Sequence, residues 1–347
     1  MYDILSQNNI AGTTRRLLAA AAAAAVIALP TAASAEDHET GDDAPVFLTL
    51  DNHGDLNFNQ LLGVNNKRII AGYFGDGAVV PNNGYVLVPK NHYAPDNFTH
   101  LPAGDTASQT QAIGINDKSF PDIVGFYTDN ATGFTHGFLD SNGVQTAVDD
   151  PAGLPPNVGT PVQNLLAIND FGKAAGFWTD AKGHEHGYVV QLNTAHLGSS
   201  KFTEISPKEF KSDAVATQAS DITDNDNVCG FWTDAAGNNH GFFGHLGHRL
   251  NSFKVTIRGA TAVSTSPFGC NNEGEIVGSF TDAAGAVHGF IWSNGRFSQF
   301  DAPGSSQTAA FGVSGTFING INDRGDIVGF YSDGTKVHGF ARLAGDE

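Results

Sequence analysis

The sequence predicts an all-β fold: a six-bladed β-propeller of four-stranded antiparallel blades. The first observation is a repeat, because the glycine of an Ile-Val-Gly-like core recurs at spacings of 48 to 54 residues, at Gly72, Gly125, Gly176, Gly230, Gly278 and Gly329. A period near 50 residues indicates units that bury their faces only against neighbours. The second observation is a pair of adjacent aromatic residues in most copies, as in Phe126 and Tyr127. Neighbours on a strand point to opposite faces, so each sheet must be covered on both sides, as in radially packed blades.

The last copy shows how one blade is built. We expect its first strand in residues 317–323, its second in residues 326–333 and its third in residues 337–343. Asn-Asp-x-Gly and Asp-x-x-Gly turns separate these strands, because glycine accepts positive φ and Asn or Asp bonds the turn backbone. A fourth strand follows in most copies, as in residues 144–148 and 296–300. Each unit is therefore predicted to be a meander of four strands.

The first 35 residues are predicted to be an export signal and not part of the fold. Arg15 and Arg16 precede an alanine-rich apolar run, and residues 33–35 form a small-residue cleavage site. Both a twin-arginine and an ordinary Sec signal fit this pattern. Residues 36–44 are expected to be an acidic disordered leader, and residues 45–347 a single six-repeat domain. We expect a secreted or periplasmic protein without a membrane span after signal removal, because no later stretch reaches about 20 apolar residues.

The charge of the chain argues against nucleic acid as a partner. The whole sequence has 18 Lys and Arg against 36 Asp and Glu. The signal contains two of the basic residues and one of the acidic ones, which leaves a net charge of about −19 on the mature chain. Such a surface repels phosphate backbones.

The ends of the chain are predicted to close the ring. Residues 46–51 and 56–60 look like the third and fourth strands of an incomplete blade, and the C-terminal copy supplies strands one to three. We expect the segment 46–60 to pair with that copy, because each alone exposes a sheet edge. Cys229 and Cys270 replace core aliphatic residues of other copies, so buried thiols are favoured over a disulfide, which export would permit.

The repeated pattern INDxGxIVGxYxDxxGxxHGF, followed by a Pro-Gly step as in residues 300–308, resembles that of bacterial extracellular HAF-repeat proteins. The resemblance covers residues 45–343. It implies export and repetition, but no activity, because the family has no agreed one. The first copy departs from the pattern, since Asn83 stands where the other copies have His.

An aspartate and a histidine flank the turn between the second and third strands of most copies. We interpret each pair as a hydrogen-bonded brace within its own blade, because a residue needed in nearly every blade is structural more often than catalytic. A ring of such groups that binds a cation or a polar ligand is the alternative. The pairs are Asp129 and His136, Asp180 and His186, Asp234 and His240, Asp282 and His288, and Asp333 and His338.

Departures from the repeat are the better functional hints. His184 and His186 lie at i and i+2, hence on one strand face, where they could share a divalent metal with a third ligand from a neighbouring blade. An exposed polar loop is the favoured interpretation, because this spacing matches no defined zinc pattern, and metal binding is the alternative. No other cofactor is indicated. Ser314 lacks the sequence context of a hydrolase nucleophile, and no catalytic motif is recognised elsewhere.

We therefore expect an exported binding or scaffolding module for a protein or a surface polysaccharide. The alternative is an extracellular lyase or hydrolase that degrades a polymer, with its site over the central channel. Fold does not decide between these functions. The connections between blades are long and irregular, and they should lie on the same face as the turns between second and third strands. Because binding residues concentrate in loops on a rigid scaffold, we expect the function on this long-loop face.

Overall fold

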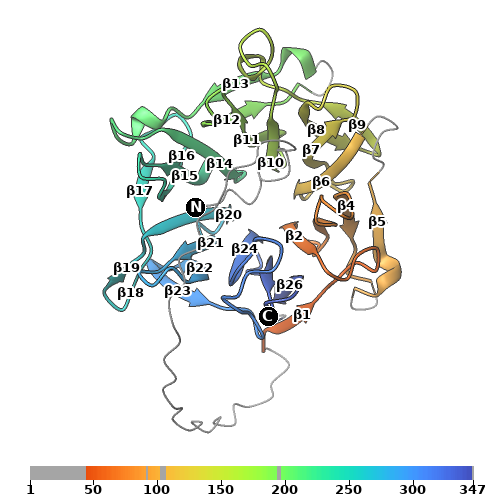
Figure 1. Ribbon diagram of the computed structural model, residues 1–347, viewed down its shortest axis with the longest axis vertical. Helices are drawn as coiled ribbons and strands as arrows, with labels where there is room; N and C mark the ends of the chain where they lie inside the picture. The colour runs from red at the N-terminus through yellow and green to blue at the C-terminus, as the bar shows by residue number, and fades with distance from the viewer. Residues whose placement is uncertain (1–43, 91–92, 102–106, 194–196, 346–347) are drawn as a thin grey trace, which may run out of the picture.

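The computed structural model describes residues 44–90, 93–101, 107–193 and 197–345. In this part of the chain the fold prediction is confirmed: six four-stranded antiparallel sheets stand around a central axis, as blades of a β-propeller (Figure 1). The inner strand of each blade contacts the inner strands of both neighbouring blades, so the ring is closed.

Each blade runs from an inner strand at the channel to an outer strand at the rim. Blade 1 comprises β2 (Asn59–Val64), β3 (Ile70–Phe74), β4 (Asn83–Leu87) and β5 (Phe98–His100), and blade 2 comprises β6 (Ala107–Ile115), β7 (Ile123–Asp129), β8 (Thr135–Ser141) and β9 (Val144–Ala147). Blade 3 comprises β10 (Gln163–Ile168), β11 (Lys173–Thr179), β12 (Glu185–Gln191) and β13 (Lys201–Glu204), and blade 4 comprises β14 (Ala216–Ile222), β15 (Asn227–Thr233), β16 (Asn239–His245) and β17 (Asn251–Phe253). Blade 5 comprises β20 (Ser264–Cys270), β21 (Ile276–Thr281), β22 (Val287–Ser293) and β23 (Arg296–Phe300), and blade 6 comprises β24 (Thr316–Ile321), β25 (Ile327–Ser332), β26 (Val337–Leu343) and β1 (Val46–Thr49).

In the described part of the chain, the connections outside the six sheets contain short elements. A two-stranded hairpin precedes blade 5, and four 3₁₀ turns lie between strands or blades. These elements are β18 (Thr256–Ile257), β19 (Ala260–Thr261), η2 (Pro95–Asn97), η3 (Pro151–Gly153), η4 (Leu197–Ser199) and η5 (Pro207–Glu209).

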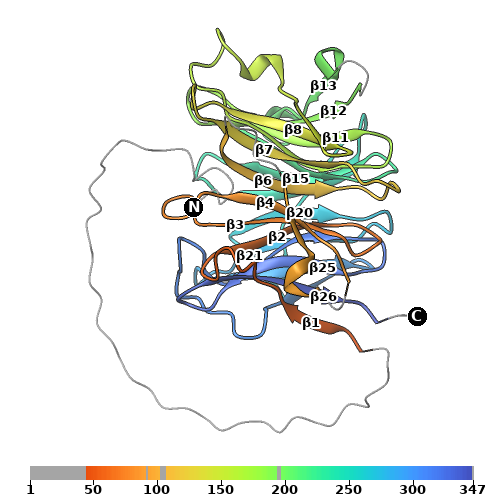
Figure 2. The ribbon, with the colours of Figure 1, turned by 90° about the vertical axis from the view of Figure 1, so that its right-hand side faces the viewer.

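The N-terminal strand β1 completes the last blade. It pairs antiparallel with β26, from Val46 opposite Leu343 to Thr49 opposite Phe340, and Figure 2 shows the two strands side by side. The prediction that residues 46–51 and 56–60 form the third and fourth strands of this blade is wrong, because β26 is its third strand and β1 its fourth. Residues 59–64 are instead β2, the inner strand of blade 1, and almost all of them are buried, whereas an outer strand is half exposed.

Aromatic packing reinforces this closure. The ring of Phe47 on β1 stacks on that of Phe340, with centroids 5.5 Å apart, and lies 6.5 Å from the rings of Phe300 and Tyr331. Beyond β1, the imidazole Nδ1 of His338 lies 2.6 Å from a carboxylate oxygen of Asp51. The first described strand is therefore held in blade 6 by backbone pairing, and it contacts blade 5 through the ring of Phe47.

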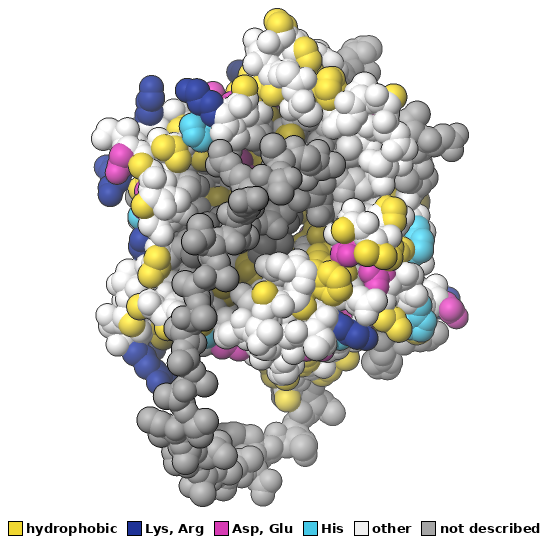
Figure 3. All heavy atoms as spheres, in the orientation of Figure 1, with side chains coloured by type: hydrophobic (Ala, Val, Ile, Leu, Met, Phe, Trp, Pro, Cys, Tyr) yellow, Lys and Arg dark blue, Asp and Glu magenta, His cyan; other side chains and the backbone are white. Residues whose placement is uncertain are grey.

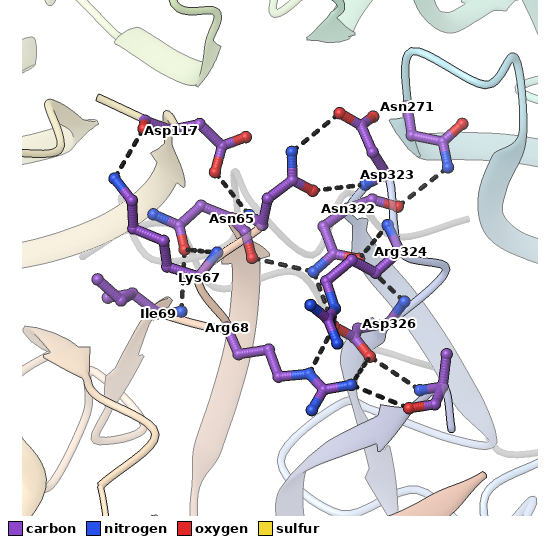
Figure 4. Close-up of polar contacts among 12 residues, drawn as sticks. Asn65, Lys67, Arg68, Ile69, Asp117, Asn271, Asn322, Asp323, Arg324 and Asp326 are labelled. Carbon is purple, nitrogen blue, oxygen red and sulfur yellow. Dashed lines mark hydrogen bonds and ion pairs between the residues drawn. The ribbon is translucent and has the colours of Figure 1, made fainter. Parts of the chain in front are cut away.

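A ring of six hydrogen bonds joins the blades at the hairpins between first and second strands. In each hairpin a backbone N–H donates to the side-chain Oδ1 of the equivalent residue in the next blade, over 2.6 to 3.0 Å. The residues of this hairpin ring are Asn66, Asp117, Asp170, Asp224, Asn272 and Asp323, and the last donates to the first. Figure 4 shows the junction of blades 1 and 6, where the amide of Asn322 also donates to the carbonyl of Asn65.

Every inner strand carries a one-residue register shift against its neighbour, which is typical of a β-bulge. The extra residues are Leu62, Ile113, Leu166, Ser220, Phe268 and Asn319. Side chains of Leu62, Ile113 and Leu166, from three different blades, share one hydrophobic cluster against which Phe268 packs. The bulge residues therefore point to the axis, and the channel is filled by side chains at this level.

Two further sequence predictions concern the chain's chemistry and ends. Cys229 and Cys270 are buried and not joined by a disulfide, as predicted. The predicted signal, residues 1–35, and residues 36–43 of the predicted leader lie outside the described residues. Within the described part of the chain, no helix has the length and apolar character needed to cross a bilayer.

We predict that Phe47→Ala lowers the free energy of unfolding by about 2 kcal/mol, because a half-buried aromatic ring leaves its contacts in two blades. Thermal unfolding measures the effect. Val46→Ala is the control, since that side chain is 52% exposed at the start of the same strand. Equal melting temperatures for the two variants would show that β1 does not close the ring.

Candidate functional site

A cavity of about 480 Å³ opens on the face where second and third strands turn. Three glycines of such turns line it, Gly183, Gly237 and Gly285, together with Gly312 and Ser314 from the long connection before β24. We call it the long-loop cavity. It lies on the face where we expect the function, and its lining comes from blades 3 to 6.

The cavity exists because blade 5 lacks two large side chains. In five blades the first residue of the aromatic pair on the second strand carries a bulky ring. These residues are Tyr73, Phe126, Phe177, Phe231 and Phe330, and all but Phe231 belong to the hydrophobic cluster of the bulge residues. Blade 5 has Ser279 in this place, opposite Ser266 on its inner strand. The residues equivalent to Ser266 are Gln60, Gln111, Asn164, Gln218 and Phe317. Two serines therefore stand where other blades pack a ring against an amide or a second ring.

The lining combines hydroxyl groups with phenyl rings. Hydroxyls come from Thr233, Ser264, Ser266, Ser279, Thr281 and Ser314, and rings come from Phe231, Phe268, Phe280, Phe317 and Phe330. Asn239 donates from its backbone N–H to Oγ of Ser264 at 2.9 Å and from its side chain to Oγ of Ser266 at 3.0 Å. Because both serines accept these bonds, their O–H groups can donate to a ligand.

Charge is sparse in the cavity. Among the described residues that line it, Glu185 is the one carboxylate, and there is no Lys or Arg. Glu185 is buried, and the side chain of Gln218 donates to its Oε2 at 3.5 Å. On the face seen in Figure 3, Lys and Arg side chains lie mainly toward the outer edge. The chemistry of this cavity is therefore that of uncharged hydrogen-bonding groups and apolar rings.

Of the two predicted metal ligands, His184 lines the cavity and His186 does not. Nδ1 of His184 and Nε2 of His186 are each 3.5 Å from Oδ2 of Asp180, and His184 lines the cavity. His186 also stacks on Trp178, with ring centroids 4.1 Å apart. Within the described chain, no group of three or more His, Cys, Asp or Glu residues could hold a metal ion. A metal bound by His184 and His186 thus stays a prediction without support from the geometry.

The predicted Asp–His pairs are close together in four blades. Imidazole Nε2 to carboxylate Oδ2 is 2.9 Å for His240 and Asp234, 3.2 Å for His338 and Asp333, 3.5 Å for His186 and Asp180, and 3.7 Å for His288 and Asp282. In blade 2, His136 instead lies 2.7 Å from Asp149, and Asp129 accepts N–H groups of its own turn, from Ala131 and Thr132. The role of these pairs as a structural brace stays a prediction.

These histidines make two further kinds of contact that were not predicted from the sequence. Each imidazole packs on the aromatic ring of its second strand, in the pairs Tyr127–His136, Trp178–His186, Trp232–His240, Phe280–His288 and Tyr331–His338. In four blades Nδ1 faces a carboxylate at or beyond the end of the fourth strand, namely Asp149, Glu204, Asp301 or Asp51. In blade 1, which lacks the histidine, His100 of β5 packs on Phe74 instead. The aspartate that follows the fourth strand, as at Asp149 and Asp301, is the sequence signal from which the contact with Nδ1 could have been predicted.

These contacts shift the titration of both partners. Hydrogen bonds to Asp149 and to Asp51 raise the pKa of His136 and of His338, respectively. Burial acts to raise the pKa of Asp234, but hydrogen bonds, foremost from His240, outweigh it and lower that pKa to about 2. The imidazolium forms of His136 and His338 are therefore favoured.

No protein-family model and no curated protein matches this sequence. Solved structures are similar in fold only. The Aleuria aurantia lectin in complex with α-methyl-L-fucoside is 12% identical, with 70% of this chain and 76% of that chain covered and a TM-score of 0.42. The Trypanosoma rangeli sialidase in complex with sialic acid is 8% identical, with coverages of 83% and 54% and a TM-score of 0.46. The Hadza microbial sialidase Hz136 is 8% identical, with coverages of 82% and 66% and a TM-score of 0.49. At such identities and scores, none of these likenesses indicates a ligand.

We predict that His338→Gln lowers the free energy of unfolding by about 1 kcal/mol at pH 6, because it removes charge-assisted hydrogen bonds to two carboxylates. The folded-state pKa of His338 lies above its unfolded value. Its contribution is therefore complete below pH 6.5 and is lost as pH rises through the raised pKa. Denaturant unfolding at pH 6 and pH 9 measures the difference.

The control for this prediction is His53→Gln, because that histidine is exposed. The gap between wild type and His338→Gln should narrow at pH 9, while the control variant should track wild type at both pH values. A gap that widens with pH would show that the neutral imidazole, and not the imidazolium, is the bracing form.

Proposed function

We propose that this protein is an exported binding module, and that its long-loop cavity takes the end of a neutral polysaccharide. The observation that carries the proposal is the replacement of two large side chains by Ser266 and Ser279, which hollows one side of an otherwise filled propeller. The resulting volume of about 480 Å³ falls within the range of roughly 300 to 1,000 Å³ that is usual for small-ligand sites.

The lining favours a saccharide over a protein surface. Sugar rings have apolar C–H faces, which pack on phenyl rings such as Phe268 and Phe280, and hydroxyls that pair with Ser264 and Ser266. A protein partner needs roughly 800 Å² of surface on each side, which a concave cavity of this size does not supply. The chain end of a polysaccharide fits both the shape and the hydroxyl-rich lining.

The charge of the site favours a neutral ligand. Glu185 is the one charged group among the described lining residues other than His184, and the whole chain has a formal net charge of −18. An acidic sugar would bring its carboxylate toward these groups without a Lys or Arg of the described lining to pair with it. Repulsion would lower both affinity and association rate.

A hydrolase or lyase that acts on the same polymer is the alternative function. Glycoside hydrolysis in its common form uses two carboxyl groups about 5 to 9.5 Å apart. Glu185 supplies one such group, and the described lining supplies no second one. Binding therefore accounts for the cavity with fewer additional residues than hydrolysis.

Export and family membership are part of the same proposal. The N-terminal apolar run after Arg15 and Arg16 supports passage to the periplasm or the medium, where polysaccharide is found. The repeat pattern supports placement among the HAF-repeat proteins. After export, the protein would encounter a polysaccharide on the outer side of the membrane.

We predict that Ser279→Phe abolishes saccharide binding, with affinity at least tenfold lower, because the new ring fills the cavity as it does in the other blades. A glycan array of neutral and uronic-acid oligosaccharides first identifies the best ligand, and titration calorimetry then compares the variants. The fold should persist, since five blades already carry an aromatic side chain at this place.

Ser298→Phe is the matched control, because it makes the same chemical change on the exposed outer strand of blade 5. This variant should bind like wild type. Unchanged affinity in Ser279→Phe, or array signals confined to uronic-acid oligosaccharides, would contradict the proposal.

A further inference from the structure

A second, smaller cavity of about 100 Å³ lies at the opposite end of the channel, inside the hairpin ring. All six ring residues line it, and the bulge residues form its walls from below. Phe268 and Asn319 line both this cavity and the long-loop cavity, so these two side chains separate them. We call the smaller one the ring cavity.

The ring cavity carries more negative charge than the hydrogen bonds of the hairpin ring require. Each ring bond between backbone N–H and Oδ1 needs no charge, since Asn66 and Asn272 also provide that oxygen. The amides of these two residues donate to Oδ2 of Asp323, whereas Oδ2 of Asp117 and of Asp170 has no such bond to a ring amide among the described contacts. The other four members are aspartates. Burial raises the pKa of Asp117, and the carboxylates of Asp170 and Asp323 raise it further, as expected for like charges held close together.

The basic side chains of these hairpins pair elsewhere. Arg68 and Arg324 pair with Asp326, and Lys173 pairs with Asp226. Lys67 donates to the backbone carbonyls of Asp117 and Lys118. Each of these cations is thus occupied by a group other than a ring carboxylate.

Independent of the carboxylates, the walls contain buried oxygens without a donor. Ser220 is only 4% exposed, and its Oγ has no hydrogen-bond partner. It occupies the bulge position, whose side chains in blades 1, 2, 3 and 5 are apolar and meet at the axis. Oδ1 of Asn319, the bulge residue of blade 6, is likewise buried and unpartnered. Both residues line the ring cavity, so a donor bound there would satisfy these two oxygens.

The residue after Ser220 adds a further acceptor. Asp221 also lines the ring cavity, whereas the equivalent residues of the other blades are Gly63, Gly114, Ala167, Gly269 and Gly320. Its carboxylate accepts the backbone N–H groups of Ile222 and Cys270. Blade 4 thus replaces an apolar pair of residues with a hydroxyl and a carboxylate at the cavity wall.

We propose that the ring cavity binds an alkylammonium group, which enters from the hairpin face. Within the described chain, no three His, Cys, Asp or Glu residues could hold a metal directly. A cation held by hydrogen bonds at about 2.7 to 3.2 Å tolerates wider spacing than a coordinated metal. A primary ammonium is compact and has three donors and no acceptor, which suits a cavity with surplus acceptors.

The test compares the charged ring with a neutral one. Asp117→Asn combined with Asp170→Asn keeps Oδ1 as the acceptor of both ring hydrogen bonds, as in blades 1 and 5, but removes two charges. Titration calorimetry with putrescine, and separately with the peptide acetyl-Gly-Gly-Lys-Gly-Gly-amide, should show binding to wild type. The double variant should bind at least tenfold more weakly and should melt at the same or a higher temperature without ligand.

Glu273→Gln is the control, because this exposed residue directly follows Asn272 of the ring and changes the charge of the same face. It should bind like wild type, whereas Ser220→Val should weaken binding. Binding of putrescine alone would identify a free amine as the ligand, and equal binding of the peptide would identify a lysine side chain of a partner. Absence of binding at millimolar concentration, or an unchanged affinity in the double variant, would overturn the proposal.

Discussion

Six hydrogen bonds between backbone N–H groups and Asn or Asp side chains fix the six blades relative to one another at one end of the channel. Each bond is worth only about 1 kcal/mol net. However, each donor and acceptor belongs to a hairpin that its own blade holds rigid, so the bonds form together or not at all. Bonded partners are about 51 residues apart in the sequence, so each hairpin bonds to the equivalent hairpin of the next blade.

This constraint at the hairpin end leaves the opposite end free to vary. There an imidazole packs on an aromatic ring and faces carboxylates of its own blade, as at His240 and Asp234, and fewer bonds, such as that from Asn239 to Ser264, join neighbouring blades. A brace within one blade places no demand on its neighbours. Long connections can therefore be accepted on that face, and a large side chain such as the aromatic replaced by Ser279 can be lost without opening the ring.

The sequence was sufficient for the features that are local to one repeat. Strand order, blade number and the Asp–His positions follow from a pattern of about 50 residues, because each blade is a meander of neighbouring segments. Features that join repeats were less accessible. The Asn and Asp of the hairpin ring were predicted only as turn residues, since nothing in one copy shows that Asp117 meets Asn66. The assignment of residues 56–60 was wrong for a related reason, because β-propensity alone does not distinguish an inner strand from an outer one. Ser279 was visible as a departure, but the cavity also depends on Ser266 across the strand pair.

The departures from the repeat are not spread evenly around the ring. Blades 1 to 3 fill the channel with Leu62, Ile113 and Leu166, whereas blades 4 and 6 place Ser220 and Asn319 at the same level. A ring of equal units offers a ligand either six equal positions or one on the axis. Polar or small residues confined to one half instead make the walls of each cavity unequal, while the apolar half keeps the packing that holds the blades together. Because the two cavities share Phe268 and Asn319, occupation of one can alter the wall of the other through contact alone.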